Sequence, residues 1–161
     1  MGVPYKTELL FCPGNVQHSI ILKSKTILLM KTRFTPEHIT SLAPNEVFVF
    51  GSNLAGFHAG GAARIAHRNF GAKWGEGVGL QGQSYAIPTM QGGVETIKPY
   101  VDEFINFAAS HPELTFYVTR IGCGIAGFHD TDIAPLFARA ITAENIVLPQ
   151  EFVRIIEGET S

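Results

Sequence analysis

From Glu46 onward, the pattern of apolar and polar positions predicts strands and helices in alternation. Short apolar runs rich in β-branched and aromatic residues are typical of buried strands. These runs occupy 46–50, 84–89, 114–122 and 145–149. Between them, apolar residues recur at the spacing of an amphipathic helix. The predicted helices span 61–70, 94–112 and 131–141.

This alternation favours an α/β fold with three layers, in which a mainly parallel sheet carries helices on both faces. Two glycine-rich segments, 51–61 and 120–128, each follow a predicted strand. In such sheets, ligands bind beyond the carboxyl ends of the strands. The sequence therefore predicts that the two segments are loops that meet at one ligand.

The chain before residue 45 has a different pattern. We expect an N-terminal extension or edge strands plus a short helix over 1–44, followed by one domain over 45–161. Residues 18–30 have the pattern of a strand pair. Met30 is an alternative start of the protein, in which case 1–29 would be an appendage.

Two further segments have local signals. In 35–42, Thr35 is a suitable N-cap and Pro36 suits the first helical position, so we expect a short helix. The segment 72–83 has too many glycines for a helix or a strand, and we expect a long loop there.

Composition and charge limit the classes of partner that the protein is expected to bind. The net charge is −2 and no cluster of Lys or Arg is present, which argues against nucleic-acid binding. A small-molecule ligand that carries phosphate is compatible with this net charge, because backbone N–H groups bind phosphate without charged side chains. No apolar stretch reaches the ~18 residues of a membrane-spanning helix, so we expect no membrane partner.

The two cysteines, Cys12 and Cys123, are far apart in the sequence. Their spacing indicates neither a disulfide framework nor a metal site. This usage is typical of a reducing compartment, so we expect a cytoplasmic protein with no metal and no cofactor.

The first glycine-rich segment reads FVFGSNLAGFHAGGAARIA with its flanks. It contains neither the dinucleotide-binding nor the P-loop fingerprint, and glycines alone are also typical of a tight strand–helix turn. Asn53 is more informative. Its amide can cap a turn, or it can donate to and accept from a ribose hydroxyl.

In the second segment, Gly122, Gly124 and Gly127 allow the backbone to approach a ligand closely. Cys123 lies among them and has two interpretations. It is either a nucleophile, which would need a partner base, or a small buried residue that shapes the loop, which we favour.

Three ring side chains in or directly after the two segments also have two interpretations each. His58 and His129 are either acid–base groups or solvated loop residues. Phe128 either stacks on a ring or ribose of the ligand, or packs in the core.

Together the two segments resemble the macro domain, an ADP-ribose-binding module, and the likeness covers residues 46–149. That family has a strand ending in an Asn-Ala-Ala-Asn-like element and a glycine turn into a helix. Asn53 matches the second Asn, and Gly60 and Gly61 match the turn. The family's second loop, G-[IV]-[FY]-G-[FY], corresponds to 124–128.

The resemblance implies that N–H groups of 124–128 cradle a diphosphate. It also implies that Asn53 and the Gly60–Gly61 turn hold the distal ribose, against which Phe128 packs. The candidate ligand-binding residues are Gly51, Ser52, Asn53, Gly60, Gly61, Gly122, Cys123, Gly124, Ile125, Ala126, Gly127 and Phe128. The candidate catalytic residues are Asn53, His58 and His129.

The sequence also departs from the family. Phe50 replaces the first Asn, Ala63 replaces an Asp that orients water in many hydrolytic members, and Ala126 replaces an aromatic residue. These changes indicate a divergent, macro-like branch. The resemblance implies binding of ADP-ribose or a related nucleotide. The alternatives are hydrolysis of an ADP-ribosyl or ADP-ribose phosphate bond, a non-catalytic sensing module, and an α/β protein with another ligand.

Overall fold

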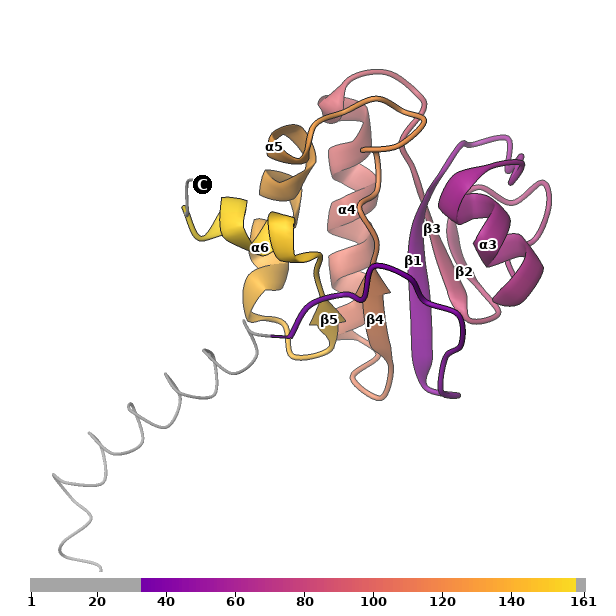
Figure 1. Cartoon of the computed structure of the whole chain (residues 1–161), viewed down its shortest axis with the longest axis horizontal. Helices are drawn as coiled ribbons and strands as arrows, with labels where there is room; N and C mark the ends of the chain where they lie inside the picture. The colour runs from indigo at the N-terminus through magenta and orange to yellow at the C-terminus, as the bar shows by residue number, and fades with distance from the viewer. Residues whose placement is uncertain (1–32, 159–161) are drawn as a thin grey trace, which may run out of the picture. The chain divides into compact units, whose positions relative to one another are not determined.

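The computed structural model describes residues 33–158, which form a mostly parallel α/β fold (Figure 1). Their sheet has five strands in the order β2-β3-β1-β4-β5. Strand β1 runs parallel to β3 and β4, and β5 runs parallel to β4, whereas β2 is antiparallel to β3. The strands are β1 (Glu46–Ser52), β2 (Gly79–Gln81), β3 (Ser84–Pro88), β4 (Thr115–Val118) and β5 (Ile146–Val147). The α/β class and the mainly parallel sheet are confirmed.

Helices follow β1, β3, β4 and β5 among the described residues. They are α3 (Gly61–Asn69), α4 (Val94–Ala109), α5 (Asp130–Ile133), the 3₁₀ helix η1 (Ala134–Thr142) and α6 (Gln150–Ile156). The helices predicted over 61–70 and 94–112 are present as α3 and α4. The segment 131–141 is helical as predicted, but most of it is the tighter 3₁₀ form. The sequence analysis did not predict α6.

The continuous apolar run of β1 is explained by burial on both faces. Val47 and Val49 point into a large core cluster that includes residues of α4, η1 and α6. The alternate residues Phe48 and Phe50 point into a smaller cluster with Ala63 and other residues around α3. Figure 1 accordingly shows α3 on one side of the sheet and α4, α5 and α6 on the other.

The prediction of a short helix over 35–42 is wrong. No helix occurs in this described segment. Instead, Phe34 forms a parallel bridge with Leu148, and the Thr35 hydroxyl donates to the carbonyl oxygen of Val147 at 2.9 Å. Thr35 therefore extends the pairing at the β5 edge of the sheet, and no helix begins at it.

The prediction of a long loop over 72–83 is also wrong in part, because the segment contains β2. Leu80 lies opposite Tyr85 in the antiparallel pair with β3. The tight connection uses Gly82, whose φ of +59° lies in the left-handed region that favours glycine. A three-residue strand beside glycines carries too little alternation to be recognised from the sequence.

The strand pair predicted over 18–30 and the appendage predicted over 1–29 lie outside the described residues and stay predictions. The predicted domain boundary at 44–45 lies within the described residues and also stays a prediction. Across residues 33–158, none of the helices has the length and apolar character needed to cross a bilayer.

Candidate functional site

A cavity of about 290 Å³ lies beyond the carboxyl ends of the central strands. Both glycine-rich loops line it, as the sequence analysis predicts for a parallel sheet. The first loop contributes Gly51, Ser52, Asn53, Gly60 and Gly61 of the candidate residues. The second loop contributes Gly122, Gly124, Ile125 and Ala126. Five candidates are not among the lining residues: His58, Cys123, Gly127, Phe128 and His129.

The two loops touch where they leave the sheet. A Cβ atom on Gly51 would lie 3.2 Å from Thr89 Oγ1 and 3.4 Å from the backbone nitrogen of Gly122. Gly122 has a φ of +76°, and a Cβ there would lie 3.0 Å from Ile133 Cδ1. Glycine at these two positions therefore allows the two loops to pack closely where they line the cavity.

Asn53 braces its own loop. Its Nδ2 donates to the carbonyl oxygen of Phe57 at 3.1 Å, and its Oδ1 accepts from the Phe57 N–H at 3.0 Å. An amide has two donor hydrogens and two acceptor lone pairs, so one of each remains for another partner. The turn-forming interpretation of Asn53 is thus seen directly in these contacts, while its contact with a ribose stays a prediction.

Residues 73–77, which follow α3, pack against the first loop, and we call this set of contacts the clamp. The Ser52 hydroxyl donates to the carbonyl oxygen of Gly77, and the Gly75 N–H donates to that of Gly56 at 3.0 Å. The approach is so close that a Cβ on Gly77 would lie 2.0 Å from the carbonyl oxygen of Asn53. Gly56 and Gly77 therefore allow this close backbone packing, a role that the sequence analysis missed.

His58 belongs to this clamp. Its side chain is 1% exposed, and Nε2 lies 2.8 Å from the carbonyl oxygen of Lys73 and 3.1 Å from that of Glu76. Since carbonyl oxygens only accept, Nε2 carries the proton and donates to them. Nδ1 is buried and has no partner among the described residues. His58 is therefore a buried structural residue, and the solvated-loop interpretation is wrong.

The second loop presents backbone donors. No described residue accepts a hydrogen bond from the N–H groups of Gly124, Ile125 or Ala126. A Cβ on Gly124 would meet no atom within 4 Å, so this stretch of backbone borders open space. The Ile125 side chain lies over the start of α3, because its Cδ1 would be 3.3 Å from a Cβ on Gly60.

Helix α3 begins at the same cavity. Gly61, Ala62 and Ala63 of its first turn line the cavity, and their N–H groups have no acceptor among the described residues. The N-cap residue is Gly60, which supplies no side-chain cap, and no acidic residue lies in the first turn. The positive end of the helix dipole therefore faces the cavity without a neutralising group, which favours an anion.

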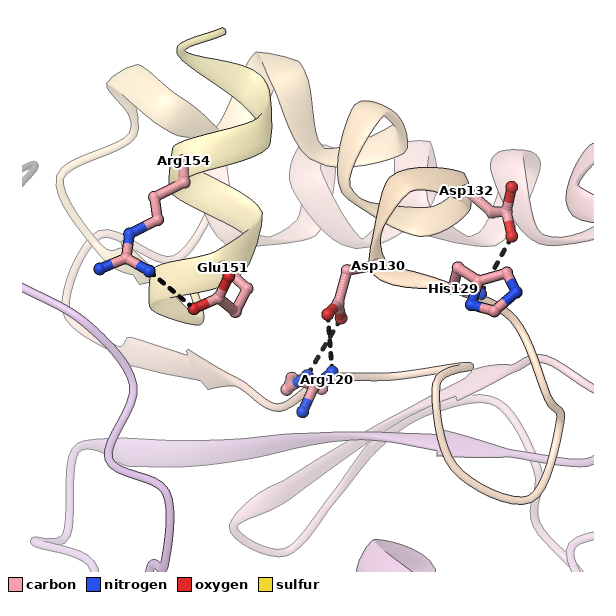
Figure 2. Close-up of polar contacts among 6 residues, drawn as sticks. All are labelled: Arg120, His129, Asp130, Asp132, Glu151 and Arg154. Atoms are coloured by element: carbon pink, nitrogen blue, oxygen red, sulfur yellow. Dashed lines mark hydrogen bonds and ion pairs between the residues drawn. The ribbon is translucent and has the colours of Figure 1, made fainter. Parts of the chain in front are cut away.

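Figure 2 shows the charged cluster beside the second loop. Arg120 lines the cavity and forms a two-pronged ion pair with Asp130, with Nε–Oδ1 at 3.0 Å and Nη2–Oδ2 at 2.6 Å. Burial raises the pKa of the Cys123 thiol to about 12, and its hydrogen bond to Asp130 adds to this. Burial alone would raise the pKa of Asp130, but hydrogen bonds from Arg120 and Cys123 lower it. Cys123 is thus held as a thiol at neutral pH, which supports the loop-shaping interpretation.

The remaining candidates make contacts within the second loop and at the start of α5. The Gly127 N–H donates to the carbonyl oxygen of Gly124, and the Phe128 N–H donates to that of Gly122 at 2.8 Å. The Phe128 ring packs against the large core cluster. His129 is exposed and precedes α5, where its backbone N–H donates to Asp132 Oδ2 at 3.0 Å (Figure 2). These contacts hold the second loop and the start of α5 together.

Residues that the sequence analysis missed also line the cavity. Thr89 directly follows β3, and Thr119 and Arg120 directly follow β4. The rule that predicted the loops, namely that ligands bind beyond the carboxyl ends of parallel strands, would have found these three as well. Phe57 and Met90 complete the rim.

The described residues that line the cavity include no carboxylate, histidine or cysteine, and Arg120 is their one charged side chain. This lining therefore offers a ligand backbone N–H groups, the side chains of Ser, Asn and Thr residues, and the Arg120 guanidinium, all of which suit an anion.

The comparisons with known proteins add no relative. No family model matches the chain, and neither a curated protein nor a solved structure does.

Proposed function

We propose that this protein binds the diphosphate of ADP-ribose or a related nucleotide in the cavity between its two glycine-rich loops. One observation carries the proposal. Backbone N–H groups of Gly124, Ile125 and Ala126 and of the first turn of α3 border the same cavity and have no acceptor among the described residues. Two sets of donors from separate elements suit a ligand with two neighbouring phosphates.

The macro-domain resemblance belongs to this proposal, together with the three-layer arrangement that the alternation of strands and helices predicts. At Phe50, the departure from the family has a clear consequence. This side chain is fully buried and packs edge-on against His58 at a centroid distance of 5.4 Å. The position that would carry the family's first Asn thus stabilises the core in this chain, and Asn53 alone would remain for the ribose.

Among the alternatives, the cavity favours a non-catalytic sensing module over a hydrolase. His58 and His129 do not line it. By the macro-domain resemblance, Ala63 stands where many hydrolytic members carry an Asp that orients water. Hydrolysis would depend on the ligand's own phosphate. The cytoplasm, where such nucleotides are present, remains the compartment that we expect.

Calorimetric titration of the full chain with ADP-ribose, NAD and AMP tests the proposal. We expect ADP-ribose and NAD to bind at one site and more tightly than AMP, which carries a single phosphate. Absence of binding by all three, or tightest binding by AMP, would contradict diphosphate recognition. Incubation with an ADP-ribosylated protein tests the alternative, and we expect no release of ADP-ribose.

A further inference from the structure

Phe57 and Trp74 form an exposed aromatic pair at the rim of the cavity. Their ring centroids are 5.7 Å apart and their planes are inclined by 31°. The two residues are 57% and 55% exposed, although large aromatic side chains are usually well buried. Phe57 lines the cavity directly, and no other aromatic residue of the described chain does so.

The pair is held in place from below. Asn53 fixes both the N–H and the carbonyl group of Phe57. Trp74 packs against the rings of His58 and His67, with centroid distances of 6.4 and 5.9 Å. His58 is in turn hydrogen-bonded to the carbonyl groups on either side of Trp74's turn, at Lys73 and Glu76. A rigid apolar surface of this kind binds with little loss of conformational entropy.

The size of the cavity leaves part of the proposed ligand outside. About 290 Å³ is at the small end of the range for ligand pockets. We expect a diphosphate with one ribose to occupy much of that space, which would place the base at the rim. The rim offers one planar aromatic surface continuous with the cavity, and nucleobases stack well on aromatic side chains.

We infer that Phe57, supported by Trp74, stacks on the base of the bound nucleotide and makes the site selective for base-bearing diphosphates over sugar phosphates. This inference rests on the proposed function and adds a specificity-determining residue to it. The base is preferred to a protein partner because Phe57 belongs to the cavity that holds the anion donors.

The test compares ligands with and without a base. Calorimetry of the full chain uses ADP-ribose, pyrophosphate and ribose 5-phosphate on wild type, Phe57→Ala and Phe57→Tyr. Phe57→Ala should weaken ADP-ribose binding about five- to a hundredfold, the range that corresponds to loss of one base–aromatic stack. It should leave pyrophosphate binding unchanged, and Phe57→Tyr, which keeps the ring, should bind ADP-ribose like wild type.

Leu80→Ala is the matched control, because Leu80 is a 43% exposed apolar residue on β2 that does not line the cavity. It should alter no affinity. Trp74 is the chain's one tryptophan, so its fluorescence gives a second readout. ADP-ribose should quench it, and pyrophosphate should not.

The two proposals fail differently. If wild type and Phe57→Ala bind ADP-ribose equally and Trp74 fluorescence does not distinguish the ligands, the stacking inference is overturned while diphosphate binding stands. The aromatic pair would then be a surface for another partner. If neither ADP-ribose nor pyrophosphate binds wild type, both proposals are overturned.

Discussion

Gly77 packs directly against Asn53: a Cβ atom on Gly77 would lie 2.0 Å from the Asn53 carbonyl oxygen. Because both are backbone positions in separate loops, a side chain on Gly77 forces one loop to move. This relationship ties the shape of the cavity to a segment that does not line it, since Asn53 lines the cavity and Gly77 does not.

We therefore expect Gly77→Ala to lower the free energy of unfolding by about 1–3 kcal/mol, the usual cost of overpacking. It should also weaken ADP-ribose binding, because Asn53 and Phe57 shift together. Urea denaturation and calorimetry measure the two effects. Gly124→Ala is the control, since its Cβ meets open space and should change stability by no more than about 0.5 kcal/mol. Equal stability of the two variants would contradict the clamp.

Asn53 and Cys123 should differ in importance for the ligand. Asn53→Ala removes both hydrogen bonds to Phe57, and loss of such bonds typically costs ~0.5–1.5 kcal/mol each. We expect ADP-ribose affinity to fall about threefold to tenfold or more. Cys123→Ser keeps the size of a side chain that does not line the cavity, so affinity should stay close to wild type. A large loss in Cys123→Ser beside a normal Asn53→Ala would instead indicate thiol-dependent function.

The Cys123 thiol predicts a stability loss in alkali. Its pKa is raised by burial from 9.0 in the unfolded chain to about 12 in the fold. The native state therefore keeps a proton that the unfolded state releases. The stabilisation is complete below pH 9 and is lost as the pH rises towards 12. The difference in unfolding free energy between wild type and Cys123→Ser should shrink over that window. A pH-independent difference would contradict the raised pKa.

Periodicity accounts for what the sequence analysis predicted correctly. Residues 47–50 are apolar without interruption because both faces of β1 are covered, and this pattern is local enough to recognise. The position of the two glycine-rich loops at one edge follows from the parallel direction of β1 and β4. The place of the cavity and its glycine-rich lining therefore follow from the parallel strands and the glycine content alone.

The interpretations that failed depend on contacts between distant segments. Gly56 and Gly77 are glycines because two loops approach one another, which no pattern within either loop reveals. His58 in a glycine-rich loop resembles an acid–base residue, yet its ring is buried against carbonyl groups from residues 73 and 76. Thr35 has the sequence context of a helix cap, but its hydroxyl and its N–H donate to the distant carbonyl groups of Val147 and Leu148.

In the proposed site, backbone N–H groups without an acceptor among the described residues hold the ligand, and the amide resonances of these groups report directly on its binding. A ¹H–¹⁵N correlation spectrum of the full chain should be recorded during titration with ADP-ribose, with Leu80 and other amides of β2 as internal controls. We expect the largest shifts at Gly124, Ile125, Ala126 and residues 61–63, and we expect these shifts to saturate together with one dissociation constant. Binding that leaves these amides unshifted, or shifts them less than those of β2, would contradict it.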